Sequence, residues 1–344
     1  MNYGRTSLRR RAKQLDARGT RIRHKIGVIL GKLLLIGIIV GGCATVSFGV
    51  GAFKGILASA PDISEVDVIP TGYSTKVLAA DGSETAKLVA AGSNRQYVTI
   101  DQIPENLQHA VVAIEDERFY DHNGIDLKGI VRALVADVRT RDFSQGASTL
   151  TQQLIKNNVL SEQWANENDS NISKMEKMER QVQRKIQEQY LAIELEKKVN
   201  DKNWILENYL NSINLGSNTL GVQAAAQRYF GKDVSKLTLS ECAVIAGITK
   251  NPAGYNPILH PKENAKRRKN VLDAMKKQGY ISQKQYDKAM ADDVYGRISE
   301  HNDVREETMN TYFVDAVIDD VFDDLVNIKG YSCLLYTSDA ADEL

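Results

Sequence analysis

The strongest constraint on this chain is an uncharged segment of 21 residues, from residue 33 to residue 53. At about 1.5 Å of rise per residue, a helix of that length spans the roughly 30 Å hydrocarbon core of a bilayer. The segment therefore predicts one transmembrane helix. A cleaved signal peptide is the alternative, but the basic region before the segment is long and the apolar run exceeds a usual signal core.

Charge is divided unevenly along the chain. Residues 1–32 hold ten Lys and Arg against one acid, Asp16, which leaves 34 basic and 43 acidic residues in the remainder. A basic flank places the N-terminus in the cytoplasm and the residues after the helix outside it. Attraction to anionic lipid headgroups explains the basic tail better than nucleic-acid binding, so no nucleic-acid partner is expected. Three widely spaced cysteines without a CxxC motif predict neither a disulfide framework nor a zinc site.

The sequence beyond the membrane segment falls into four parts. Residues 60–100 hold β-forming clusters at 73–79 and 84–89, with a third candidate strand at 96–100, and predict a small β stalk. Residues 101–298 are the expected globular domain. Residues 299–331 are expected to be an acidic linker toward a missing C-terminal domain. Residues 332–344 resemble a non-native read-through, so they are not expected to belong to the fold.

Helical periodicity dominates residues 101–298, so we predict a mainly α domain. A capping box at Thr238 and Glu241 and a stop at Pro252 mark the ends of one helix, and Ser148 or Thr149 can cap another. Residues 161–178 are polar and irregular. The predicted helices cover residues 101–115, 125–138, 149–157, 179–198, 204–213, 222–230, 239–249, 261–278 and 282–291.

Glu115 is the first candidate for chemistry, because it ends an apolar helical segment and opens the cluster EDERFYDHNG. A carboxyl beside aromatic surface loses solvation of its charged form, which suits a general acid or base near neutral pH. Taken alone, the cluster is more often a solvated charged turn.

Two later helical segments add polar stripes at i, i+4 and i+8 spacing. The first stripe is Ser148, Gln152 and Lys156, flanked by Thr149 and Gln153, and its amides and hydroxyls suit sugar or phosphate oxygens. The second stripe carries two arginines, a lysine and a glutamate, and it suits a phosphate or pyrophosphate. An intrahelical Arg–Glu pair is the alternative for this stripe. The residues of the second stripe are Arg180, Arg184, Lys185 and Glu188.

Five segments taken together carry a family resemblance. They are EDERFYDHNG, GASTLTQQLIKN, RKIQE, NYLNSINLG with GVQAAAQRYFGK, and LTLSECAVIAGITKNPAGYNP, in this order along the chain. They resemble the successive motifs of the family 51 peptidoglycan glycosyltransferases, the N-terminal module of class A penicillin-binding proteins. The resemblance covers about residues 71–279. It implies a mainly α, lysozyme-like glycosyltransferase domain that polymerises lipid II with inversion, with undecaprenyl pyrophosphate as the leaving group.

The resemblance also implies roles for individual residues. Glu115 is expected to be the catalytic base, and Glu188 the second catalytic glutamate, which assists the leaving group, orients nearby cations or holds a divalent cation. The only cofactor left open is that cation, Mg²⁺ or Mn²⁺. The expected substrate-binding residues are Asp116, Phe119, His122, Arg132, Ser148, Thr149, Gln152, Gln153, Lys156, Arg180, Arg184 and Lys185.

Lipid II, the growing glycan chain, membrane lipids and a cell-wall synthesis complex are the expected partners, at the cell membrane. Residues 126–143, with Leu127, Ile130, Leu134 and Phe143, are predicted to supply an amphipathic face at the interface. A muramidase or a non-catalytic cell-wall scaffold remains the alternative. The chain has no Ser-x-x-Lys and no Lys-Thr/Ser-Gly motif, so a transpeptidase site is not predicted within it.

Overall fold

The computed structural model describes residues 4–15, 18–63, 68–69, 75–78, 82, 84–88, 95–140, 148–161, 164, 172–217 and 219–302. The chain divides into two units, residues 1–60 and residues 61–344. The sequence-predicted read-through and all but the first four residues of the predicted acidic linker lie outside the described residues.

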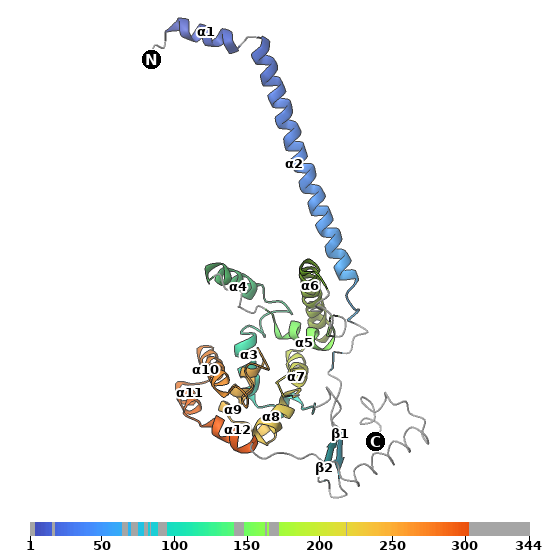
Figure 1. Cartoon of the computed structure of the whole chain (residues 1–344), viewed down its shortest axis with the longest axis vertical. Coiled ribbons are helices and arrows are strands. Elements are labelled where there is room, and N and C mark those ends of the chain that lie inside the picture. Colours follow the sequence, from blue (N-terminus) through green and yellow to red (C-terminus); the bar gives the residue numbers. More distant parts are fainter. Residues whose placement is uncertain are drawn as a thin grey trace, which may run out of the picture. The chain divides into compact units, whose positions relative to one another are not determined.

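The first unit consists of two helices, α1 (Arg5–Leu15) and α2 (Arg18–Ala58) (Figure 1). Within α2, residues His24–Ala58 form the one helix of the described chain that is long and apolar enough to cross a membrane, with a mean hydropathy of 2.4. The helix is longer than the predicted span of residues 33–53, because the basic segment before the span and the residues after it continue the same helix. The uncharged segment lies inside it, as predicted.

The second unit begins with a two-stranded antiparallel hairpin, β1 (Thr75–Leu78) and β2 (Glu84–Leu88), in which Thr75 pairs with Leu88. The two strands agree with the predicted clusters, and Gly82 has the positive φ of 82° that a tight turn favours. That the hairpin acts as a stalk stays a prediction.

The predicted third strand is wrong. Residues 96–99 are extended without strand pairing, and Ile100–Gln102 form the 3₁₀ helix η1. A side chain takes the place of a neighbouring strand: the Asn211 Nδ2 donates to the Val98 carbonyl at 2.8 Å, and the Val98 amide donates to Asn211 Oδ1 at 3.0 Å. Both backbone groups of Val98 are satisfied without a sheet.

A buried helix, α9 (Leu239–Ile248), forms the centre of the helical domain. Every residue from Ser240 to Ile248 is buried, as expected of a helix that is apolar on all sides. The predicted capping box is confirmed, since Thr238 and Glu241 each bond the other's backbone amide. Helices α3 (Glu105–Glu115) and α10 (Pro261–Lys277) pack against α9 and against each other.

Three helices form a second group, in which α5 (Leu150–Asn158) packs against α6 (Lys174–Val199) and α7 (Lys202–Ser212). Thr149, not Ser148, caps α5. Helix α6 begins five residues before the predicted start, because Ser173 caps it by accepting from the amide of Glu176. The end of the segment predicted to be irregular is therefore helical.

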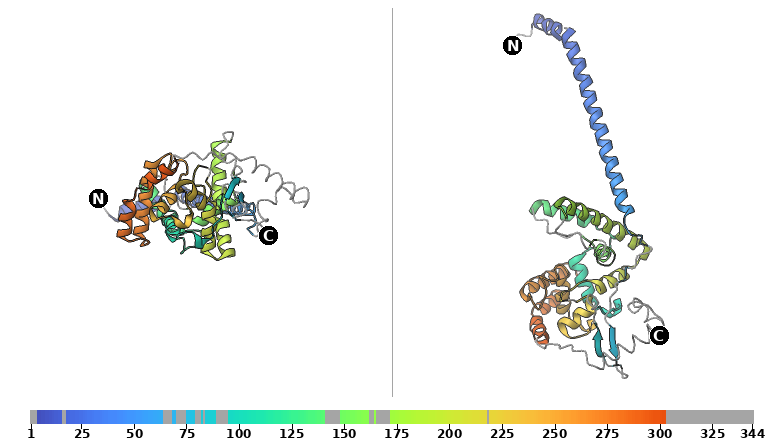
Figure 2. Two further views of the ribbon diagram at one scale, coloured as in Figure 1. Left: turned by 90° about the horizontal axis from the view of Figure 1, so that it is seen from below. Right: turned by 45° about the vertical axis from the view of Figure 1, so that its right-hand side comes forward.

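The remaining helices are α4 (Leu127–Thr140), α8 (Val222–Phe230), η2 (Val234–Lys236), α11 (Gln283–Met290) and α12 (Val294–Asn302). In both figures the yellow to orange helices α8, α10, α11 and α12 lie around α9 (Figures 1 and 2). Helix α12 was not predicted and takes in the first residues of the predicted linker. The described chain is thus mainly helical, as predicted, and its two helix groups meet at the site.

Candidate active site

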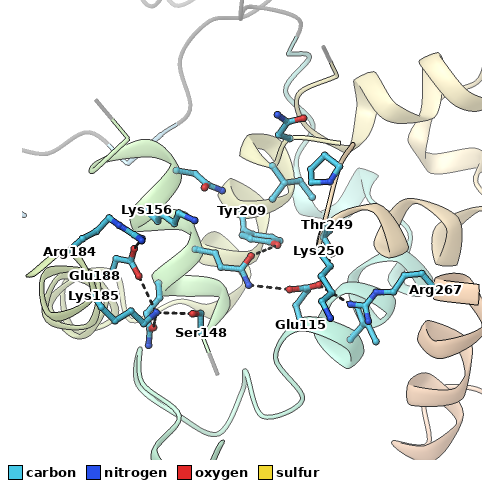
Figure 3. A pocket seen from close by; sticks show the side chains of 17 residues that line it. Glu115, Ser148, Lys156, Arg184, Lys185, Glu188, Tyr209, Thr249, Lys250 and Arg267 are labelled. Atoms are coloured by element: carbon cyan, nitrogen blue, oxygen red, sulfur yellow. Dashed lines mark hydrogen bonds and ion pairs between the residues drawn. The ribbon is translucent and has the colours of Figure 1, made fainter. Parts of the chain in front are cut away.

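A cavity of about 930 Å³ lies between the two helix groups (Figure 3). Its walls come from the end of α3, from α5, α6 and α7, and from the segment after α9 with one residue of α10. The residues that line it are Ile114, Glu115, Ser148, Gln152, Gln153, Lys156, Asn157, Arg184, Lys185, Glu188, Tyr209, Ile213, Asn214, Thr249, Lys250, Pro252 and Arg267.

Glu115, the last residue of α3, supplies the carboxylate of one wall. The Thr249 hydroxyl donates to Glu115 Oε1 at 2.7 Å, and Arg267 Nη2 approaches the same oxygen at 3.4 Å. Gln153 Nε2 donates to the other oxygen at 3.2 Å. The carboxylate is thus held by donors from three elements while it lines the cavity, which is the geometry that a general base requires.

Positive charge gathers on the opposite wall, where α6 faces α5 (Figure 3). Lys185 Nζ donates to Ser148 Oγ at 2.7 Å, to Gln152 Oε1 at 2.9 Å and to Glu188 Oε2 at 3.0 Å. Arg184 binds the other oxygen of Glu188, whose side chain is only 3% exposed. The alternative of an Arg184–Glu188 pair is therefore realised, and this pair itself lines the cavity.

The loop that follows Glu115 is attached to α5 through a buried carboxylate. Asp116 accepts from the Leu150 amide at 3.0 Å and contacts His122 Nε2 at 3.0 Å. The Gly124 carbonyl accepts from the Thr149 hydroxyl at 2.7 Å and from Gln152 Nε2 at 3.2 Å. These bonds fix the start of α5, and so the position of its polar stripe, relative to Glu115.

We expect Gly124→Ala to lower the free energy of unfolding by about 2–4 kcal/mol. Gly124 has a φ of 86°, and a Cβ there would lie 2.6 Å from the backbone of Ala192 in α6. Chemical denaturation measures the change. Gly279→Ala is the control, because Gly279 has a φ of 82° with nothing within 4 Å of an added Cβ. Equal losses in the two variants would contradict the steric part of the argument.

The structure brings eight of the residues predicted from sequence to the cavity: Glu115, Ser148, Gln152, Gln153, Lys156, Arg184, Lys185 and Glu188. Six others lie outside its lining. Asp116, Phe119 and His122 have buried side chains in the supporting loop, and Thr149 is the cap of α5. The other two form ion pairs on exposed faces: Arg132 with Glu117 at 2.8 Å, and Arg180 with Glu176 at 2.9 Å.

Nine of the lining residues were not predicted from sequence as site residues, among them Tyr209, Thr249, Lys250 and Arg267. The first three lie within motifs that carry the family resemblance, so the motifs themselves were the available signal. Arg267 lies in an ordinary amphipathic helix. Only the packing of α10 against α3 brings its guanidinium to Glu115.

A divalent cation at Glu188 does not fit the residues that are described. Both carboxylate oxygens of Glu188 are engaged by Arg184 and Lys185, whose positive charges oppose a metal ion. Within the described part of the chain, no group of three or more His, Cys, Asp or Glu side chains is placed to hold a metal.

Fold and site together define a helical domain in which the Glu115 carboxylate lies opposite a cationic wall, in a chain that also has an apolar helix long enough to span a membrane. The sequence model of the Transglycosylase family matches residues 81–276, more than half of the chain. The chain therefore belongs to this family, the family 51 peptidoglycan glycosyltransferases that its motifs resemble.

Similar proteins are penicillin-binding proteins from several bacteria. Penicillin-binding protein 1A of Clostridium novyi is 38% identical over 77% of this chain and 30% of its own length. Penicillin-binding protein 1A/1B of Bacillus subtilis is 39% identical over 75% of this chain and 25% of its own length. Penicillin-binding protein 1A of Aquifex aeolicus is 46% identical over 57% of this chain. The chain thus spans about a quarter to a third of these first two relatives.

Proposed function

We propose that this chain is a peptidoglycan glycosyltransferase that polymerises lipid II into glycan strands. The observation that carries the proposal is the cavity, in which a carboxylate faces a cationic wall. Transfer of a sugar from a pyrophosphate carrier needs a base for the acceptor hydroxyl and positive charge for the departing pyrophosphate. Family membership and the similarity to penicillin-binding proteins support the same function.

Glu115 takes the proton from the 4-hydroxyl of the acceptor sugar in the proposed reaction. The hydroxyl oxygen then forms a bond to the anomeric carbon of the donor, and the bond from that carbon to the pyrophosphate breaks, with inversion. Undecaprenyl pyrophosphate leaves with the electron pair. Lys185, Arg184 and Lys156 meet its growing negative charge, because they lie on the wall opposite Glu115.

Glu188 orients the cations in this proposal. Its buried carboxylate binds Arg184 and Lys185, so both side chains are fixed before substrate arrives. A fixed charge costs no reorganisation when the leaving group departs.

The chain is further proposed to cross the membrane once, with the N-terminus in the cytoplasm and the cavity outside. Ten basic residues within the first 32 support this orientation. The donor and the acceptor would then meet the enzyme at the outer leaflet, where a lipid-linked substrate keeps its pyrophosphate at headgroup level. The amphipathic face predicted for residues 126–143 stays a prediction. Leu127 is exposed there, whereas Phe143 and the side chain of Leu134 lie outside the described residues.

The direct test uses the full chain in detergent with purified lipid II. Polymerisation into long glycan products, separated on a gel, is the expected result. Release of fragments from finished cell wall, with lipid II left unpolymerised, would instead identify a muramidase. Neither activity, together with binding to cell wall, would identify a scaffold.

A further inference from the structure

A chain of two hydrogen bonds connects a buried tyrosine to the proposed base. The Tyr209 hydroxyl in α7 donates to Gln153 Oε1 in α5 at 3.0 Å. Gln153 Nε2 in turn donates to Glu115 Oε2 at 3.2 Å. Three helices that are distant in sequence therefore meet in one connected series at the cavity wall (Figure 3).

The direction of this series follows from the chemistry of its members. An ionised carboxylate only accepts hydrogen bonds, so the end of the Gln153 amide that faces Glu115 has to be the NH₂ group. Its carbonyl oxygen then faces α7 and requires a donor. Burial, together with the nearby carboxylates of Glu115 and Asp116, raises the pKa of the Tyr209 hydroxyl well above its usual value, so the hydroxyl stays protonated and can donate.

The opposite orientation of the amide is unfavourable while Glu115 is ionised. It would bring the carbonyl oxygen of Gln153 against a carboxylate oxygen, and two acceptors repel each other unless Glu115 is protonated. A donor on α7 therefore favours the orientation that stabilises the ionised base. Hydrogen bonds in series also polarise one another, which strengthens the bond from Gln153 to Glu115.

Other charged groups also act on Glu115 from the elements around it. Arg267 of α10 lies 3.4 Å from its Oε1, and Lys250 after α9 lines the same cavity. The remaining charged groups are Asp116 in the adjoining loop, Lys156 of α5, and Arg184, Lys185 and Glu188 of α6 across the cavity. These groups are unchanged when the Tyr209 hydroxyl is removed, so its effect can be measured separately.

We propose that Tyr209 and Gln153 are positioning residues, which hold the donor end of the Gln153 amide on Glu115 and keep this base ionised and aimed into the cavity. The inference rests on the proposed function, because it assigns the two residues to the base of that reaction. Gln153 therefore has a role beyond the substrate contact that the motif implies.

The test of this proposal is the pH dependence of lipid II polymerisation, measured for the wild type, Tyr209→Phe and Gln153→Met. Removing the hydroxyl deletes one buried donor, so we expect kcat to fall roughly tenfold. The acidic limb of kcat/KM is expected to move to higher pH by about 0.5–1 unit, because protonation of the base is then easier. The KM of Tyr209→Phe for lipid II should change little.

Tyr229→Phe is the matched control. Tyr229 is fully buried like Tyr209, and its hydroxyl donates to the Leu215 carbonyl at 2.6 Å, outside the cavity lining. The control loses a comparable hydrogen bond and should keep the pH profile of wild type. The proposal is wrong if Tyr209→Phe behaves like this control. It is also wrong if Tyr209→Phe and Gln153→Met lower activity without moving the acidic limb of kcat/KM.

The double variant Tyr209→Phe/Gln153→Met separates a connected series from two independent contacts. If Tyr209 acts through Gln153, the double variant should be no slower than Gln153→Met alone. Multiplied losses would overturn the proposal.

The failure of the proposed function gives a different result from the failure of this inference. If the wild-type protein does not polymerise lipid II, the proposed function is wrong. If the wild-type protein is active but the variants keep its pH profile, only the inference is wrong. Gln153→Met keeps the test valid if Tyr209→Phe does not fold.

Discussion

Glu115→Gln is expected to lower the rate of lipid II polymerisation by roughly 10²–10⁴-fold, the range that a general base contributes. The amide keeps the shape of the side chain and can still accept from the Thr249 hydroxyl, which donates to Glu115 at 2.7 Å. It cannot take a proton from the acceptor hydroxyl. The measurement is the initial rate of polymer formation at saturating lipid II, beside the thermal unfolding midpoint.

Glu105→Gln provides the control on the same helix. Glu105 is the exposed first residue of α3, ten residues before Glu115, and it does not line the cavity. This variant should polymerise lipid II at the wild-type rate. A Glu115→Gln protein that folds normally and keeps more than about a tenth of the activity would exclude Glu115 as the base, since even the low end of general-base catalysis exceeds that loss.

Lys185→Met is expected to have the second largest effect, a fall in kcat of roughly 10²–10³-fold, as for the loss of one donor that stabilises developing charge. Methionine keeps the apolar stem of lysine but loses three hydrogen bonds, to Ser148, Gln152 and Glu188. Stability should fall by only about 1 kcal/mol, because the Lys185 side chain is 38% exposed and solvent screens its charge.

Lys197→Met tests whether any lysine on α6 has this effect. Lys197 is 65% exposed and pairs with Glu194, away from the cavity lining, so its loss should leave polymerisation unchanged. Inhibition by inorganic pyrophosphate gives a second readout, and it should weaken in Lys185→Met but not in the control. Unchanged inhibition in both variants would place the pyrophosphate elsewhere.

The sequence predicted the helices of the domain well, because local signals decide where a helix starts and stops. Thr238 and Glu241 form the predicted capping box, and α8 has the predicted bounds of residues 222–230. The start of α6 was missed although its cap, Ser173, is local, and α12 was not predicted. The predicted third strand was wrong because a distant partner replaced a local one. Residues 96–99 have strand-like composition, but the Asn211 amide takes the place of a neighbouring strand.

The candidate site shows the same division. Glu115 and the stripe from Ser148 to Lys156 could be predicted, because helical spacing places their side chains on definable faces. Spacing could not tell which members of a motif reach the cavity and which support it. Asp116 and His122 follow the base by one and seven residues in sequence, yet their side chains are buried against each other beneath the start of α5.

The sequence by itself determined the family, the apolar helix and the mainly helical domain, and it predicted Glu115 and the cations of α5 and α6 as candidate site residues, because these depend on residue type and local spacing. Tertiary structure alone decided what surrounds the carboxylate. Thr249, Arg267 and Gln153 reach Glu115, and Tyr209 reaches Gln153, only when α3 packs on α9 and α10 and α5 packs on α7. Contacts between distant elements follow from how complementary faces are buried together, and no local pattern encodes that choice.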